Sequence, residues 1–149
     1  MQREAGFPDF INVDLIAQGL SPFAPEKVSV QAGRIMLAEI SRRVRQRESF
    51  AFETTLAGRG YARRITRWRG MGYEVKLVFL SLPSAELAVA RVKARVAQGG
   101  HDVPEDVVRR RFDVGWRNFE KVYRGLVSSW VVYDNAGPRP RIVASGENT

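Results

Sequence analysis

Short apolar runs alternate along the chain with longer segments in which apolar residues recur every three or four positions. The short runs predict β-strands and the longer segments predict helices. Such alternation favours an α/β fold with a parallel sheet and right-handed crossovers. The predicted strands are residues 10–14, 49–53, 75–82, 130–135 and, as a short edge strand, 141–144. The predicted helices are residues 26–47, 60–69, 84–97 and 104–126.

Local signals place several helix ends and faces. Ser84 is a predicted N-cap, and Pro104 stands where a first-turn proline belongs. Gly70 and Gly72 bracket the end of one helix, with Tyr61, Ile65 and Trp68 on its inner side. The inner face predicted for helix 26–47 consists of Val30, Ile35, Met36, Leu37, Ile40 and Val44.

The composition narrows the class of protein. With 149 residues, of which 44% are hydrophobic, the chain is expected to form a single domain with a loose tail over residues 137–149. The chain has no cysteine and one histidine, which excludes disulfides, thiolate zinc sites and multi-histidine metal sites. No apolar run reaches about 18 residues, so we expect a soluble, cytoplasmic protein that does not span a membrane.

The net charge is +8, and 20 of the 24 cationic residues are arginine. Because the arginine fork matches phosphate oxygens, the charge points to phosphorylated partners, either nucleotides or nucleic acid. Solvated helix faces in a protein from a GC-rich genome are the alternative. A nucleic-acid footprint would consist of Arg63, Arg64, Arg67 and Arg69, although no aromatic residues are interleaved with them on an exposed strand.

Polar residues follow two predicted strands, where parallel α/β sheets bind their ligands. Asn12 and Asp14 end one strand, and Glu53 and Thr55 end another. Asp14 could act as a general base toward a substrate hydroxyl, and Glu53 and Thr55 could hold that substrate. The alternatives are a capping or turn role for Asp14 and an ion pair with an arginine for Glu53.

Two predicted helices joined at Gly99 and Gly100 carry a concentration of cations. Such a hairpin could close as a lid over a transferring phosphoryl group. A solvated helical hairpin is the alternative, and a metal site on the single histidine would lack partner histidines. The residues of this hairpin are Arg91, Arg95, His101, Arg109, Arg110 and Arg111.

Four ordered motifs resemble the zeta-toxin-like family of P-loop kinases, in particular its bacterial branch of predicted ATPases. The resemblance spans residues 10–145 and implies a three-layer parallel sheet flanked by helices. It also implies phosphorylation of a nucleotide sugar, UDP-N-acetylglucosamine or a similar hydroxylated molecule, with ATP and Mg²⁺. The motifs lie at residues 12–22, 52–56, 99–104 with 109–112, and 133–135.

The resemblance also implies roles for individual residues. Asp14 matches the catalytic base, and Glu53 and Thr55 match the pair that contacts the nucleotide sugar. Arg95, or Arg91 after a one-residue shift, matches an arginine that stabilises the γ-phosphoryl group. His101 stands where the family has a second arginine, and its imidazolium could substitute only when protonated.

The chain departs from the family in lacking the motif G-x-x-x-x-G-K-[S/T], whose backbone amides and lysine hold the phosphates. The first, central strand of the 2-3-1-4-5 order is also expected to be missing. Its absence would leave a gap in the sheet or force strands 49–53 and 75–82 to pair directly. A mis-set start, a truncation and a degenerate pseudoenzyme all fit this departure.

The leading interpretation is a zeta-toxin-like phosphotransferase core that is inactive or impaired alone, because the phosphate-binding loop supplies positioning and charge stabilisation. The alternative is a non-catalytic basic module that binds nucleic acid or a protein. An antitoxin or a second copy of the chain is a possible protein partner, since an incomplete sheet exposes strand edges.

Overall fold

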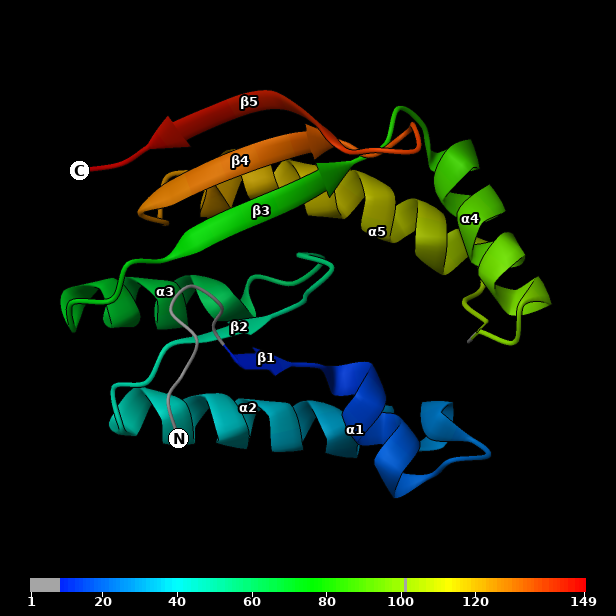
Figure 1. Cartoon of the computed structure of the whole chain (residues 1–149), viewed down its shortest axis with the longest axis horizontal. Coiled ribbons are helices and arrows are strands. Elements are labelled where there is room, and N and C mark those ends of the chain that lie inside the picture. The colour runs from blue at the N-terminus through cyan, green and yellow to red at the C-terminus, as the bar shows by residue number, and fades with distance from the viewer. Residues whose placement is uncertain (1–8, 101) are drawn as a thin grey trace. The chain divides into compact units, whose positions relative to one another are not determined.

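The protein has a mixed α/β fold, shown by a computed structural model that describes residues 9–100 and 102–149 (Figure 1). The chain, expected to be one domain, divides into two compact units, Met1–Thr54 and Thr55–Thr149. The strands form two separate sheets, one in each unit, with the orders β1-β2 and β3-β4-β5. Direct pairing of the second and third strands, one of the two expected arrangements, is therefore not observed.

The first unit is a crossover between two short parallel strands. β1 (Asp9–Ile11) leads into α1 (Val13–Leu20), and β2 (Phe50–Phe52) returns parallel to β1 with Ile11 opposite Phe52. Between them lie a 3₁₀ turn, η1 (Pro25–Val28), and α2 (Ser29–Arg45). The helix predicted from residue 26 thus begins as a 3₁₀ turn, with Pro25 at its first position.

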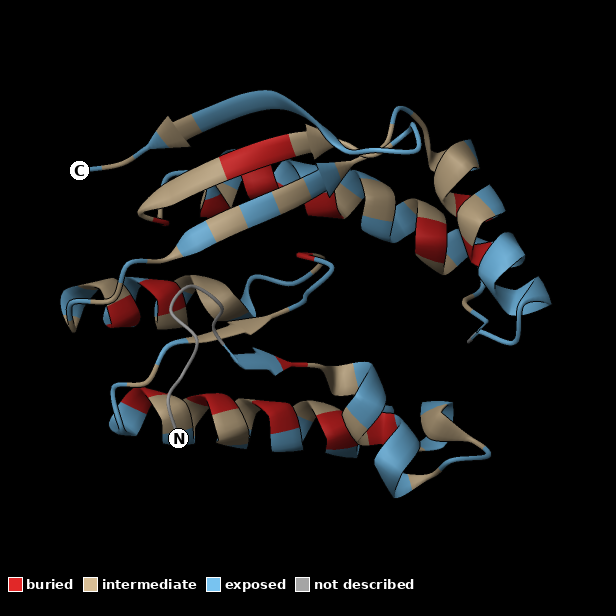
Figure 2. Cartoon of the chain, viewed as in Figure 1, coloured by how far each residue is buried: buried red, intermediate tan, exposed pale blue. Residues whose placement is uncertain are grey.

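One stripe of α2 forms the core of the first unit (Figure 2). Its buried residues recur every four positions, because successive turns of a helix bring residues four apart to one face. Val30 and Ile35, which the sequence analysis places inside, are 70% and 39% exposed. The buried residues of the stripe are Ala32, Met36, Ile40 and Val44.

The second unit is built on a three-stranded sheet. α3 (Gly60–Gly70) precedes β3 (Lys76–Ser81), and α4 (Ala85–Ala97) follows it. α5 (Glu105–Asn118) continues into a single π-helical turn, η2 (Phe119–Tyr123), so the helix predicted to reach residue 126 changes its winding at Phe119. β4 (Ser129–Asp134) runs parallel to β3, and β5 (Arg141–Glu147) runs antiparallel to β4.

β5 corrects two expectations. Its antiparallel direction makes the sheet mixed rather than parallel, because a short loop returns the chain directly beside β4. The short edge strand predicted at residues 141–144 is confirmed, but it extends over seven residues, so residues 137–149 are more ordered than the loose tail that was predicted. Gly146 is required where the strand crosses Trp130, since a Cβ atom at Gly146 would lie 2.7 Å from the indole ring.

α5 covers one face of this sheet (Figure 1), and aromatic rings fill the contact. Phe79 of β3 lies 5.3 Å from Trp116 and 5.0 Å from Phe119, measured between ring centroids. The Phe119 ring also meets Trp130 of β4 at 5.8 Å. Phe119 and Tyr123 are almost fully buried, so these rings form the centre of the unit.

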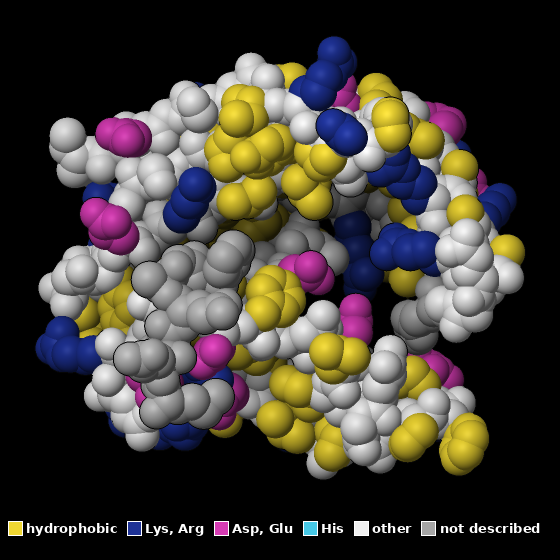
Figure 3. All heavy atoms as spheres, viewed as in Figure 1, with side chains coloured by type: hydrophobic (Ala, Val, Ile, Leu, Met, Phe, Trp, Pro, Cys, Tyr) yellow, Lys and Arg dark blue, Asp and Glu magenta, His cyan; other side chains and the backbone are white. Residues whose placement is uncertain are grey.

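The other face of the sheet carries exposed apolar side chains (Figure 3). Val78 and Leu80 of β3 are 53% and 55% exposed, and Ile142 of β5 is 64% exposed. Alternation along the strands places all three on the face opposite to Phe79. This unit is therefore apolar on both faces of its sheet but covered by α5 on only one.

Helix ends follow local rules that the sequence shows. The Ser84 hydroxyl accepts a hydrogen bond from the Leu87 amide at 3.2 Å, which confirms the predicted N-cap. α4 ends in a Schellman motif, in which the Gly100 amide bonds to the Arg95 carbonyl at 2.7 Å and Gly99 has φ +89°. The glycine pair therefore ends α4 in an ordered turn.

Candidate functional site

Asn12 and Asp14 open α1 directly after β1. The Asn12 side chain accepts hydrogen bonds from the amides of Asp14 at 2.9 Å and Leu15 at 3.2 Å, which makes Asn12 the N-cap. β1 therefore ends at Ile11, earlier than predicted, because the cap turns the chain into the helix. Asp14 lies exposed in the first helical turn, where the helix dipole favours a carboxylate.

Glu53 follows β2 at the same edge of the sheet. Ile11 and Phe52 are paired in the parallel ladder. Asn12 and Glu53 therefore each follow directly after one of two neighbouring strands, which lie about 4.8 Å apart. Both carboxylates, Asp14 and Glu53, are exposed, and neither side chain has a hydrogen bond or ion pair with any described residue. Neither a capping role for Asp14 nor an arginine partner for Glu53 is therefore present among the described residues.

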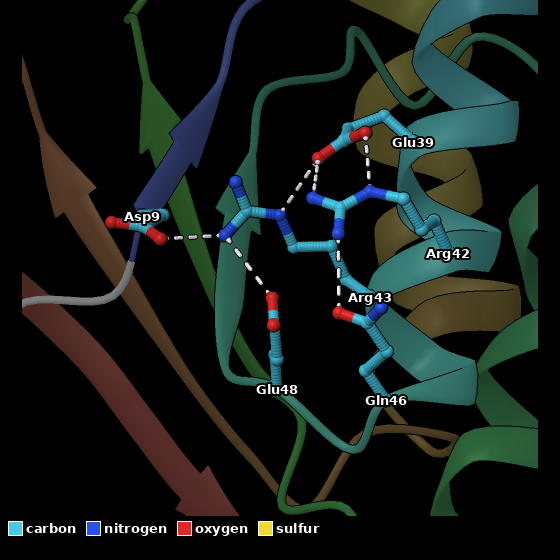
Figure 4. Close-up of polar contacts among 6 residues, drawn as sticks. All are labelled: Asp9, Glu39, Arg42, Arg43, Gln46 and Glu48. Atoms are coloured by element: carbon cyan, nitrogen blue, oxygen red, sulfur yellow. Dashed lines mark hydrogen bonds and ion pairs between the residues drawn. The ribbon is translucent and has the colours of Figure 1, made fainter.

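An ion-pair network fixes α2 against the start of β1 (Figure 4). Arg43 donates to Asp9 at 2.6 Å and to Glu39 at 3.0 Å, and its guanidinium lies 3.8 Å from Glu48. The guanidiniums of Arg42 and Arg43 hold the pKa of Glu39 at about 2, below its usual 4.5. Arginines and acids thus pair behind the strands, while the carboxylates at the strand ends stay unpaired.

In the second unit, the segment containing Thr55 is fastened to α5 and η2. The Asn118 side-chain amide, 4% exposed, donates to the Leu56 carbonyl at 2.6 Å. The Tyr123 hydroxyl donates to the Gly58 carbonyl at 2.7 Å. Gly115 allows the close approach, since a Cβ atom there would lie 2.8 Å from the Thr55 carbonyl oxygen.

These contacts hold Leu56 in a conformation that leucine rarely adopts. Its φ is +55°, in the left-handed region, and its side chain is 6% exposed. Such strain persists only where surrounding contacts enforce it, and it gathers at functional segments, as π-helical turns do. Gly115, Asn118 and Tyr123 were not among the residues predicted from the sequence. The signal that could have pointed to them is an asparagine at an inward position of a strongly charged, amphipathic helix.

Arg91 fastens α4 to the loop that follows β4. Its guanidinium donates to the Ala136 carbonyl at 3.1 Å. In the same loop, the Asp134 carboxylate accepts from the Ala136 amide at 2.9 Å, and the Asn135 amide bonds to the Ser81 carbonyl at 2.9 Å. Arg91 thus lies at the carboxyl end of β3 and β4, where ligands of parallel strands bind.

Arg109 is held by two carboxylates. It lies 3.0 Å from Glu86 of α4 and 3.1 Å from Glu105 of its own helix. These pairs raise the pKa of Arg109 and lower that of Glu86. A phosphate would have to compete with both acids for Arg109, so its clearest role here is to join α4 to α5.

The remaining cations of the hairpin are exposed. Arg95, Arg110 and Arg111 have no side-chain hydrogen bond or ion pair with the residues that the structure describes. α4 and α5 pack through an apolar cluster centred on Val92 and Val108. His101 lies outside the described residues.

The residues present do not fit ATP and Mg²⁺ held in the usual P-loop manner. The full sequence has no G-x-x-x-x-G-K-[S/T] motif, and none of its four lysines follows a glycine-rich turn. Within the described ranges, no group of three acidic or histidine side chains could hold a metal ion. In that same part of the chain, no helix has the length and apolar character needed to cross a bilayer.

Comparison with known proteins identifies a relative of this chain. An uncharacterized protein of Haemophilus influenzae is 32% identical over 102 residues, which cover 68% of this chain and 73% of the relative. No protein-family model matches the chain, and no solved structure matches it. At this identity and coverage, the chain belongs to the same family as the Haemophilus influenzae protein.

Proposed function

We propose that the chain is the acceptor-binding core of a zeta-toxin-like phosphotransferase, and that it binds a nucleotide sugar such as UDP-N-acetylglucosamine. Asp14 is the general base toward the acceptor hydroxyl, and Glu53 accepts hydrogen bonds from sugar hydroxyls or amides.

The observation that carries this proposal is the pair of unpartnered carboxylates that follow β1 and β2. Glu39 and Glu86 are paired with arginines, whereas other exposed acids, such as Asp106 and Glu120, are unpaired among the described residues like the two carboxylates but do not follow parallel strands. Asp14 and Glu53 have no arginine partner among the described residues. Acidic side chains left free at the carboxyl ends of adjacent parallel strands are available to a ligand.

Strand order within each sheet also supports the proposal. β1 pairs parallel with β2, and β3 pairs parallel with β4. In the 2-3-1-4-5 order of P-loop kinases, these pairs correspond to strands 2-3 and 4-5. The structure has no strand corresponding to the central one among residues 9–100 and 102–149.

The phosphate donor, expected to be ATP with Mg²⁺, has no cradle in this sequence. Phosphoryl transfer depends mainly on positioning and on stabilising negative charge, so these 149 residues should bind acceptor but transfer little or no phosphate. Robust, magnesium-dependent phosphorylation of the nucleotide sugar by the purified chain would contradict this part of the proposal.

Calorimetric titration with UDP-N-acetylglucosamine tests acceptor binding. The variants Asp14→Asn and Glu53→Gln remove one charge each and should each weaken binding about 10- to 100-fold, since hydrogen bonds to charged groups contribute about 1.5–3 kcal/mol. A matched pair, Asp106→Asn and Glu120→Gln, removes equally exposed acids from α5 and the turn after it. No binding by the parent chain, or equal weakening by both pairs, would reject the proposal.

A further inference from the structure

We propose that the exposed side of α3 binds the phosphate backbone of nucleic acid through three arginines, Arg59, Arg63 and Arg67. These residues are called the α3 stripe below. The proposal is independent of acceptor binding by the first unit. Nucleic acid would be a second class of ligand for the protein. The stripe would recognise the charge and spacing of its phosphates and not its base sequence.

The stripe lies on the side of α3 away from the protein core. Arg59 is the N-cap of α3, and Arg63 and Arg67 follow at four-residue spacing within the helix, so the three lie along one side of it over about 12 Å. Ile65 and Trp68, which are each 5% exposed, mark the opposite, buried side. All three arginines are exposed.

No acid accompanies the stripe. Residues 54–73 contain five arginines and no Asp or Glu. None of the three stripe arginines has a hydrogen bond or ion pair with any described side chain. Arg69, by contrast, is occupied by the carbonyls of Leu126 at 3.0 Å and Asn148 at 3.4 Å, which fixes α3 to the unit.

Two other arginine clusters differ in this respect, although Arg110 and Arg111 of α5 are unpaired among the described residues, like the stripe. Arg42 and Arg43 pair with Glu39, and Arg109 pairs with Glu86. The guanidiniums of Arg42, Arg43 and Arg109 have intramolecular partners, whereas those of the stripe have no intramolecular partner among the described residues. Unneutralised guanidiniums in a row complement an anionic polymer, because each one that meets a phosphate releases a condensed counterion.

A nucleic-acid backbone suits the dimensions of the stripe. A duplex carries one negative charge per about 1.7 Å, so 12 Å of helix faces about seven charges. Three arginines can therefore each meet a phosphate without any particular base sequence. No exposed strand with aromatic residues accompanies them, so base stacking is not part of the proposal.

Fluorescence anisotropy with a short labelled DNA duplex and a labelled single-stranded RNA tests the inference. The triple variant Arg59→Gln, Arg63→Gln, Arg67→Gln should weaken binding at least tenfold at low salt. Between about 50 and 200 mM salt, the logarithm of the binding constant falls linearly with the logarithm of the salt concentration. The slope of this line should be shallower for the variant than for the parent by about 2 to 3. Circular dichroism checks that the variant remains folded.

A matched triple variant, Arg34→Gln, Arg45→Gln, Arg117→Gln, removes three exposed arginines from α2 and α5. It should lose much less affinity than the stripe variant. Equal losses would show that net charge alone attracts the polymer and would overturn the inference. The absence of parent binding at low salt, or binding only to anionic phosphatidylserine vesicles, would overturn it as well.

Discussion

The two units hold their candidate residues by different physical means. In the first unit, three-residue strands are supported by a partly exposed ion-pair network centred on Arg43. In the second unit, the segment 55–58 is fastened by hydrogen bonds from the buried Asn118 and Tyr123, beside a cluster of aromatic rings. Exposed ion pairs are weakened by water and salt, whereas buried hydrogen bonds are costly to break.

This difference predicts that the second unit tolerates substitution at its contacts less well than the first. It also predicts that salt and pH act mainly on the first unit. Four experiments test these expectations, from the largest expected effect to the smallest.

Replacing Asn118 with Ala should lower the free energy of unfolding by about 3 kcal/mol. The change removes the hydrogen bond that the buried Asn118 amide donates to the Leu56 carbonyl and opens a small cavity. Asn135→Ala, which removes an amide that makes no side-chain hydrogen bond with described residues, should cost much less. Denaturant unfolding measures both, and equal effects would show that the Asn118 bond is not a major support.

Adding one methyl group at a glycine should have opposite effects in the two units. At Gly115 the new Cβ atom meets the Thr55 carbonyl, so Gly115→Ala should destabilise by about 2 kcal/mol. At Gly33, inside α2, nothing lies within 4 Å, and Gly33→Ala should stabilise by about 0.5–1 kcal/mol through helix propensity. Thermal unfolding of the two variants measures whether each stabilises or destabilises the protein. Stabilisation by Gly115→Ala would contradict the close approach of Gly115 to the Thr55 carbonyl.

Replacing Arg43 with Gln should destabilise the first unit by about 1 kcal/mol, because the contacts to Asp9 and Glu39 are lost. The loss should shrink as salt is raised, since salt screens partly exposed charges. Hydrogen exchange of the α2 amides reports the effect at low and high salt. Arg45→Gln, on an exposed arginine, is the control, and a loss independent of salt would count against the ion pairs.

Acid should weaken the first unit through Glu39. Its pKa is about 2 in the folded protein against the usual 4.5, so the unfolded chain binds the proton more tightly. The stabilisation is complete above pH 4.5 and is lost as the pH falls toward 2. Because the side chain is 31% exposed, solvent screening limits the effect to about 1 kcal/mol. Glu39→Gln should flatten the pH dependence of α2 amide exchange, and an unchanged profile would exclude Glu39 as its source.

Local chemistry made much of the fold predictable. The Ser84 cap, the glycine at the end of α4 and the inner position of Trp68 depend on residues within a few positions of one another. The placement of Asp14 and Glu53 after strands follows in the same way from periodicity. The sequence did not predict that these two carboxylates are unpaired among the described residues, because any of 20 arginines could have paired with them.

What the sequence determined by itself is therefore the alternation of strands and helices, the ends of α4 and the carboxylates that follow two strands. Only the tertiary structure decided that two sheets form, that β5 runs antiparallel, and that Arg43 reaches Asp9 across 34 residues. The contact from Asn118 to Leu56 spans 62 residues. Short-range patterns fix local conformation, but the choice of partner depends on which distant segments pack together, and no local pattern encodes that choice.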